Sequence, residues 1–258
     1  MNVPAIDRQR RNFITGLGLT AVGFALGGCV SNGPADHRVA ALPLAPTPEE
    51  DMPPDDGAFA DTSVGVGDAD LATMYGPIEG DRFPVPAVKL SEINPAFRRK
   101  QVDYVTTEMP GSIVVDPQHH YLYLVQEGGR AMRYGVGVGR EGFGWSGAAT
   151  INSKQEWPDW YPPKEMVQRQ PELKKALAQL QGGLGMPGGP GNPLGARALY
   201  LWQGNKDTLY RIHGTVEPWT IGKSVSSGCI RMINQDVIDL YQRVPVGTRV
   251  VVLPVRTV

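Results

Sequence analysis

The chain has 258 residues, which is room for one catalytic domain together with extensions. Its formal net charge is −1, and this near-neutral balance excludes nucleic-acid binding by bulk electrostatic attraction. The 32 glycines and 23 prolines favour a turn-rich β architecture with irregular segments over a helical bundle.

Residues 1–29 have the pattern of an export signal. Arg8, Arg10 and Arg11 make a basic start, and residues 13–26 form an apolar stretch that is too short for a comfortable transmembrane helix. The pair Arg10-Arg11 and the residues after it resemble a twin-arginine export motif. We therefore expect export to the cell envelope, into the periplasm.

The first of the two cysteines has a context of its own. Leu26-Gly27-Gly28-Cys29 resembles a lipobox, in which small residues before a cysteine admit a signal peptidase and the thiol takes a lipid. This interpretation predicts a lipoprotein anchored to the membrane through Cys29. The alternative is an ordinary signal peptide with an incidental cysteine. A disulfide with Cys229 is formally open, but the two contexts favour separate roles.

Two segments separate this signal from the predicted catalytic domain. Residues 30–85 are rich in proline, alanine, aspartate and glycine, and they keep no apolar period of helix or strand. Because such a segment buries too little apolar surface to offset its ordering entropy, we predict a disordered tether. Residues 86–110 form a transition, in which residues 94–102 are expected to make a short helix with a proline near its start.

Residues 111–254 have short apolar runs separated by turn residues, which predicts a folded, mainly β domain. A helix is expected over residues 163–181, and a second over 234–243 with Asn234 as its N-cap. The glycine- and proline-rich residues 182–193 are expected to be an irregular loop, either over the active site or as a plain connector. The expected strands cover residues 112–116, 121–125, 131–138, 199–202, 209–213 and 248–252.

The residues that carry chemistry lie in the second half of this domain. His213 ends an expected strand, and Cys229 follows it along the chain. A thiol attacks a carbonyl as a thiolate, so it needs a base or a cation nearby, and histidine has the pKa best suited to that base. Pro218, Gly222 and Gly228 allow the connection to fold back and bring the two side chains together. On spacing alone this evidence is weak, because a lone cysteine is more often a buried apolar residue.

Two neighbours of the cysteine strengthen the interpretation. Gly228 permits a tight turn, so that the backbone N–H groups of Gly228 and Cys229 could point at a developing oxyanion. Arg231 adds a positive charge that could hold a substrate carboxylate or favour the thiolate. No cysteine–histidine cluster has metal-ligand spacing, and the adjacent His119 and His120 would point to opposite faces of an extended chain.

His213-Gly214-Thr215, followed by Ser226-Ser227-Gly228-Cys229-Ile230-Arg231-Met232, resembles the signature of the L,D-transpeptidase (YkuD) catalytic domain. Asn192-Pro193-Leu194-Gly195 and residues 113–116 also match stretches of that domain, and the resemblance covers residues 111–253. One position departs from the family, which usually has histidine or asparagine where this chain has Ser227. That departure favours His213 as the only base, since no other histidine lies near the motif in the sequence. It leaves open what replaces the missing side chain.

The resemblance implies an L,D-transpeptidase-like β-sandwich with one or two short helices and with Cys229 in a cleft. It implies that Cys229 is the nucleophile, that His213 is the proton acceptor and donor, and that the Gly214 carbonyl orients the imidazole. Ser226, Ser227, Gly228 and Arg231 would surround the substrate and the oxyanion. No metal or organic cofactor is implied.

The implied substrates are peptidoglycan stem peptides. Cys229 would attack a tetrapeptide stem and become acylated, with release of the terminal D-alanine of that stem. The acyl group would then pass to an amine of another stem. The alternatives are water as the acceptor, which makes a carboxypeptidase or endopeptidase, and a protein lysine, which anchors that protein to the wall. A non-catalytic peptidoglycan-binding module is a further alternative, and a papain-like peptidase is a weaker one because its cysteine precedes its histidine. The sequence does not indicate an oligomeric state.

Overall fold

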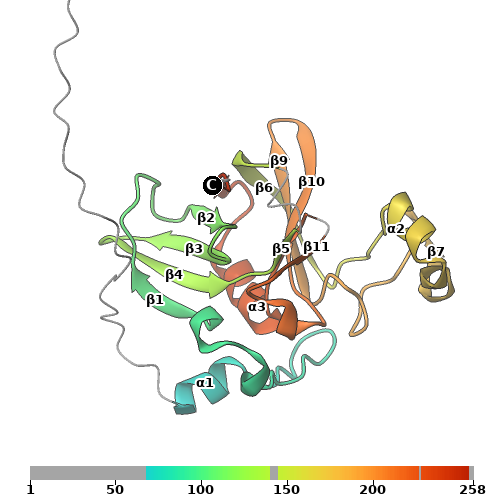
Figure 1. Ribbon diagram of the computed structural model, residues 1–258, viewed down its shortest axis with the longest axis horizontal. Helices are drawn as coiled ribbons and strands as arrows, with labels where there is room; N and C mark the ends of the chain where they lie inside the picture. Colours follow the sequence, from blue (N-terminus) through green and yellow to red (C-terminus); the bar gives the residue numbers. More distant parts are fainter. Residues whose placement is uncertain (1–67, 140–144, 227, 256–258) are drawn as a thin grey trace, which may run out of the picture. The chain divides into compact units, whose positions relative to one another are not determined.

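The computed structural model describes residues 68–139, 145–226 and 228–255 (Figure 1). The predicted export signal, Cys29, residues 30–67 of the predicted tether and Ser227 lie outside these residues, so what the sequence suggests for them remains a prediction.

Strands make up most of the regular structure. Three helices accompany them among the described residues: α1 (Asp68–Met74), α2 (Lys164–Arg169) and α3 (Asn234–Arg243). One mixed sheet contains β1 (Lys100–Asp103), β2 (Ile113–Asp116), β3 (Tyr121–Gln126), β4 (Arg130–Gly135), β6 (Gly147–Glu156), β9 (Arg197–Gln203), β10 (Lys206–His213), β12 (Ile230–Arg231) and β13 (Arg249–Val252). Two small sheets pair β5 (Val138–Gly139) with β11 (Ser224–Ser226) and β7 (Ala178–Leu180) with β8 (Gly183–Gly185).

The nine strands of the large sheet lie in the order β1-β4-β3-β2-β13-β6-β9-β10-β12. Strands β2, β3 and β4 form an antiparallel meander, as the alternation of apolar runs and turns predicts. Strand β13 pairs parallel with β2 and antiparallel with β6, and so connects the meander to β6, β9 and β10. In Figure 1 the meander and the β9–β10 hairpin lie on two sides of α3. The expectation of a mainly β fold with few short helices is confirmed.

The apolar core lies between these two parts of the sheet and α3. Val237 and Leu240 of α3 are fully buried in it, together with Ile113 of the meander and Leu201 of β9. The predicted bounds of α3 are confirmed, but Asn234 is not its N-cap, because the cap position is Ile233.

Asn234 has a different task at the start of α3. Its Oδ1 accepts a hydrogen bond from the backbone N–H of Ala196 at 3.0 Å, and its Nδ2 donates to the carbonyl of Thr215 at 3.0 Å. The side chain therefore fastens α3 to the chain that follows His213.

The disordered-tether prediction is wrong for residues 68–85. Leu71 and Tyr75, from and after α1, are buried against Ile221 and Ile233 of the catalytic domain. Isolated apolar residues without a period give no pattern in the sequence, yet each one gains free energy when it packs on a surface that is already folded. Residues 68–99 are called the N-terminal arm below.

The transition segment also differs from its prediction. Residues 94–102 do not form one helix: Pro95–Phe97 make a single 3₁₀ turn, with the Asn94 side chain accepting from Ala96 N. Lys100–Asp103 is then strand β1, which pairs with the outer edge of β4. The edge of the meander supplies backbone hydrogen-bond partners for this strand, and no local sequence pattern predicts that pairing.

The helix expected over residues 163–181 is divided. Helix α2 ends at Arg169, Pro171–Ala176 form a 3₁₀ helix, and β7 follows. Proline lacks the N–H that a continuing helix needs, and its ring clashes with the preceding turn. The expectation that residues 182–193 lack regular structure is wrong for β8, whose Gly185 lies against the Tyr161 ring.

Within the described part of the chain, no helix is long and apolar enough to cross a bilayer.

Candidate active site

The parallel pairing of β10 and β12 sets the geometry of the site. Ile212 pairs with Ile230 and His213 with Arg231. Both isoleucines are fully buried in the core. Because side chains alternate between the two faces of a strand, His213 and Arg231 point to the opposite, outer face, and so does Arg211 two residues before His213. Cys229, directly before β12, continues the same alternation toward that face.

The chain between the two strands returns through turns that need glycine. Gly222 has a φ of 81° and Gly228 a φ of 125°, a region that residues with a Cβ rarely adopt. A Cβ at Gly222 would overlap the Phe97 ring, and one at Gly228 would lie 3.0 Å from the Tyr210 ring. The expectation that these two glycines fold the connection back is confirmed.

A backbone carbonyl orients the His213 imidazole. The side chain is buried, and its Nδ1 lies 2.6 Å from the backbone oxygen of Gly214. A carbonyl oxygen can only accept, so Nδ1 carries the proton and Nε2 keeps its lone pair. Burial, together with the charges of Arg231 and Arg211, lowers the pKa of His213 to about 4, although the hydrogen bond to Gly214 opposes the shift. At neutral pH the imidazole is therefore uncharged and able to take a proton.

Cys229 lies directly before β12 and is partly accessible. Its Sγ lies 4.0 Å from the carbonyl oxygen of Leu209. Burial raises the pKa of the thiol, against the opposing effects of a backbone hydrogen bond from Arg211 and of the Arg211 and Arg231 charges. The resting group is a thiol, and it needs a base to become a nucleophile.

Two arginines flank the pair, and each has a carboxylate partner. Arg231 Nη1 lies 3.0 Å from Glu217 Oε2, and Arg211 forms two contacts of 2.8 Å with the two carboxylate oxygens of Asp207. Arg231 was singled out in the sequence, whereas Arg211 was not. Arg211 lies two residues before His213 on one strand, and this spacing is the sequence signal that would have placed the two side chains on the same face.

His120 lies closer to the cysteine motif in space than its place in the sequence indicates. Its Nε2 lies 3.0 Å from Ser224 Oγ, so this histidine contacts β11, the strand that leads to the cysteine motif. Its backbone φ of 61° places the ring there. His119 turns instead to Asp116, with 2.7 Å between Nδ1 and Oδ2. No other histidine lies near the motif along the sequence, whereas in space His120 contacts Ser224, two residues before the motif begins.

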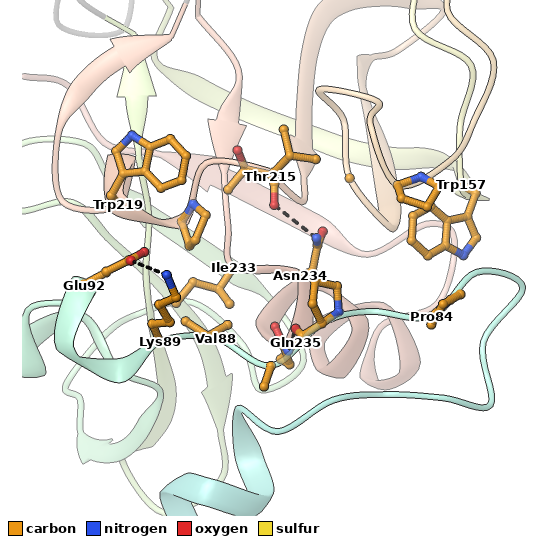
Figure 2. A pocket seen from close by; sticks show the side chains of 16 residues that line it. Pro84, Val88, Lys89, Glu92, Trp157, Thr215, Trp219, Ile233, Asn234 and Gln235 are labelled. Carbon is orange, nitrogen blue, oxygen red and sulfur yellow. Dashed lines mark hydrogen bonds and ion pairs between the residues drawn. The ribbon is translucent and has the colours of Figure 1, made fainter.

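A pocket of about 280 Å³ lies beyond the C-terminal ends of β10 and β12 (Figure 2). Thr215, Trp219 and Asn234 line it from the catalytic domain, and the N-terminal arm contributes residues 84–92. Lys89 and Glu92 of the arm face each other at 3.4 Å. The pocket therefore depends on a segment outside the cysteine and histidine motifs. Among the described residues, no cluster of metal-binding side chains is present.

Comparison with known proteins identifies the domain. Residues 110–252 match the family model of the L,D-transpeptidase catalytic domain, YkuD. Probable L,D-transpeptidase ErfK/SrfK of Escherichia coli K12 is 32% identical over 70% of this chain and 52% of its own length. The chain thus spans about half the length of this curated relative.

Solved structures give further likenesses. A Brucella melitensis structure, described as a probable carnitine operon oxidoreductase, is 55% identical and covers 64% of this chain and 99% of that chain, with a TM-score of 0.42. An L,D-transpeptidase from Mycobacterium smegmatis is 16% identical and covers 56% of this chain and 58% of that chain, with a TM-score of 0.40. The family assignment depends on the match over residues 110–252, which contains His213 and Cys229. The chain belongs to the L,D-transpeptidase catalytic domain (YkuD) family.

Proposed function

We propose that the protein is a peptidoglycan L,D-transpeptidase with Cys229 as nucleophile and His213 as general base. One observation carries the proposal: the Nδ1 proton of His213 is held by the Gly214 carbonyl, which leaves Nε2 as an acceptor on the face that Cys229 shares. The probable L,D-transpeptidases among the curated relatives support the reaction class.

The acylation step follows from the protonation states. Nε2 of His213 takes the thiol proton as the sulfur attacks the carbonyl carbon that precedes the terminal D-alanine of a tetrapeptide stem. The tetrahedral oxyanion then collapses and its C–N bond breaks. The leaving amine takes the proton back from His213, and a thioester on Cys229 remains. No proton is gained or lost over the step.

The second step resolves the thioester. An amine of another stem attacks the thioester carbon and gives a proton to His213, which returns it to the departing sulfur of Cys229. Water in place of the amine gives a carboxypeptidase or endopeptidase, and a protein lysine gives an anchoring enzyme. Acyl transfer through a thioester needs neither a metal nor an organic cofactor.

The oxyanion needs donors at the turn before β12. We assign this role to the backbone N–H groups of Gly228 and Cys229, supported by the tight turn that the φ of Gly228 produces. Ser226, the last residue of β11, and Ser227, which lies outside the described residues, are assigned to the substrate-binding wall. Arg231 is assigned to binding a substrate carboxylate, which would replace Glu217 as its hydrogen-bond partner.

The location of the enzyme is part of the proposal. The signal-like residues 1–29 and the cell-wall family support export to the envelope, and Cys29 is proposed as a lipid anchor. Replacing Cys29 by serine would then release the protein from the membrane fraction. Equal retention of wild type and Cys29→Ser would leave only the signal-peptide interpretation.

The direct test is mass spectrometry of the products formed from purified disaccharide-tetrapeptides. A cross-linked dimer with loss of one D-alanine supports the transpeptidase. Tripeptide alone identifies water as the acceptor, and protein-linked stems identify an anchoring enzyme. Binding without any product, in a chain whose Cys229 is intact, would contradict the proposal and favour a non-catalytic binding module.

A further inference from the structure

The strand that carries His213 has an irregularity on the side of Cys229. Asp207 of β10 pairs with Trp202 of β9, and Arg211 pairs with Tyr200. Between these two pairs β10 contains more residues than β9, so the register shifts. A β-bulge of this kind re-aims backbone groups and is common next to active sites. Its position places the bulged backbone beside the cysteine turn.

The bulge contains a strained residue. Leu209 has a φ of 64°, which is an outlier for a residue with a bulky side chain. The residue is 74% exposed, so burial of the leucine does not explain the conformation. Such strain persists only where the surroundings determine it, and it gathers at functional sites.

Asp207 and Arg211 hold the bulge closed. Asp207 Oδ1 accepts from the backbone N–H of Leu209 at 2.8 Å and from Arg211 Nη1 at 2.8 Å, and its Oδ2 accepts from Arg211 Nη2 at 2.8 Å. Arg211 also donates to the Tyr210 carbonyl at 2.9 Å and stacks 4.5 Å from the Tyr200 ring centre. One carboxylate thus fixes both ends of the bulged segment.

The closed bulge presents backbone groups to the nucleophile. The Leu209 carbonyl oxygen lies 4.0 Å from Cys229 Sγ, and a backbone hydrogen bond from Arg211 lowers the pKa of the thiol. Tyr210, between these two residues, has its pKa raised by burial and by the Cys229 charge, and its ring packs against Gly228. The sulfur therefore lies between an acceptor and a donor that the bulge aligns.

We propose that Asp207 and Arg211 are positioning residues, whose ion pair shapes the bulge so that the Arg211 N–H stabilises the Cys229 thiolate. The charged groups that act on the sulfur are Arg211 and Asp207 on β10 and Arg231 on β12. Two further titratable groups of β10 are nearby: Tyr210, whose pKa responds to Cys229, and the uncharged His213 on the same face of the strand. The inference rests on Cys229 being the nucleophile of the proposed function. It concerns the reactivity of the thiol and not the identity of the substrate.

The test uses two substitutions that keep the charge. Arg211→Lys retains the cation but loses the bidentate grip, and Asp207→Glu retains the anion but moves it away from the Leu209 N–H. The charges near the thiol therefore stay nearly constant. A change in the pKa of the thiol then reports a change in the position of the groups around it. Arg243→Lys is the matched control, because Arg243 forms a similar bidentate pair with Asp239 at the same spacing on α3.

The readout is the rate of alkylation of Cys229 by iodoacetamide against pH, in the full chain. Mass spectrometry of the tryptic peptide Ser224–Arg231 separates Cys229 from Cys29. We expect the apparent pKa of the thiol to rise by about one unit in Arg211→Lys and in Asp207→Glu, the effect of losing one hydrogen bond to a charged acceptor. The control Arg243→Lys is expected to leave that pKa unchanged.

A rescue completes the design. Glycine adopts the φ of Leu209 without strain, so Leu209→Gly in the Arg211→Lys background should restore the alkylation profile. Unchanged profiles in both charge-keeping variants, with stability lowered as in Arg243→Lys, would overturn the proposal and leave a purely structural ion pair. Failure to rescue would also overturn it. Normal alkylation without turnover of muropeptides would count against the proposed function alone.

Discussion

The N-terminal arm and the outer face of β10 and β12 both use arginine–carboxylate pairs, but the pairs differ in burial. In the arm, Asp81 accepts from both Nη atoms of Arg197, and the two side chains are 7% and 8% exposed. At the site, Arg231 and Glu217 are 21% and 46% exposed. A buried pair is hard to break because each partner would be left without water. A partly exposed pair can exchange a partner for a substrate.

A second cluster repeats the arm's arrangement. Arg99 lies 2.9 Å from Asp239 Oδ2 and 3.7 Å from Asp236 Oδ1, and Tyr75 donates to Asp236 at 3.3 Å. Burial raises the pKa of Asp236 to about 7, although the Arg99 charge opposes this. The arm is thus fastened to α3, the helix that follows the cysteine motif. Charge thus attaches the N-terminal arm to the domain through buried pairs, whereas the more exposed pair of Arg231 and Glu217 is the one proposed to exchange a partner.

The largest effect is expected at the nucleophile. Cys229→Ala should abolish turnover and leave the fold intact, because the thiol is partly accessible and alanine removes only the sulfur. The family resemblance also implies one carbapenem adduct per chain. Intact-mass measurement should find this adduct in the wild type and none in Cys229→Ala. An adduct that persists in the variant would place the reactive group elsewhere.

The next effect separates His213 from Ser227, which stands where the family usually has histidine or asparagine. A general base contributes on the order of 10²–10⁴ in rate, so His213→Ala should slow single-turnover acylation by about that factor. Ser227→Ala should have a much smaller effect, because a hydroxyl cannot act as a base near neutral pH. If both variants prove equally slow, Ser227 takes part in proton transfer and the assignment of a single base is wrong.

A substitution in the N-terminal arm should lower the free energy of unfolding instead of the rate of the reaction. Asp81→Ala leaves Arg197 and the Trp157 Nε1–H, now 2.9 Å from Asp81 Oδ1, without their carboxylate. Breaking a buried pair on one side costs about 3–5 kcal/mol, which urea unfolding would measure. Arg249→Ala is the control, because its pair with Glu108 lies at the surface and should matter far less. A similar loss in both variants would remove the contrast in burial.

The smallest effect is a displacement of the pH profile. Because the pKa of His213 is lowered to about 4, the imidazole stays an unprotonated base down to that pH. Acylation should therefore decline on the acid side near pH 4 and not near the ordinary histidine value of about 6.5. Single-turnover acylation against pH measures this, with circular dichroism to confirm folding. An acid limb near 6.5 would mean that the base is more exposed than the structure shows.

Part of the fold and the site was predictable from the sequence. Apolar runs between turn residues gave the β2–β4 meander, and the period of residues 234–243 gave α3, because these signals arise within a few residues along the chain. The signature around His213 and Cys229 gave the family. Gly222 and Gly228 were predictable because a tight return between strands requires φ values that glycine adopts freely.

The sequence alone determined which residue types are available for the chemistry and where the short, periodic elements form. The tertiary structure decided which distant residues meet. It placed Arg211 and the bulge at Leu209 beside the thiol, brought His120 to Ser224, and folded the N-terminal arm onto the domain. The physical reason is that burial and pairing depend on surfaces made by remote segments. A carboxylate such as Asp81 looks like any solvated residue until Arg197 is brought beside it.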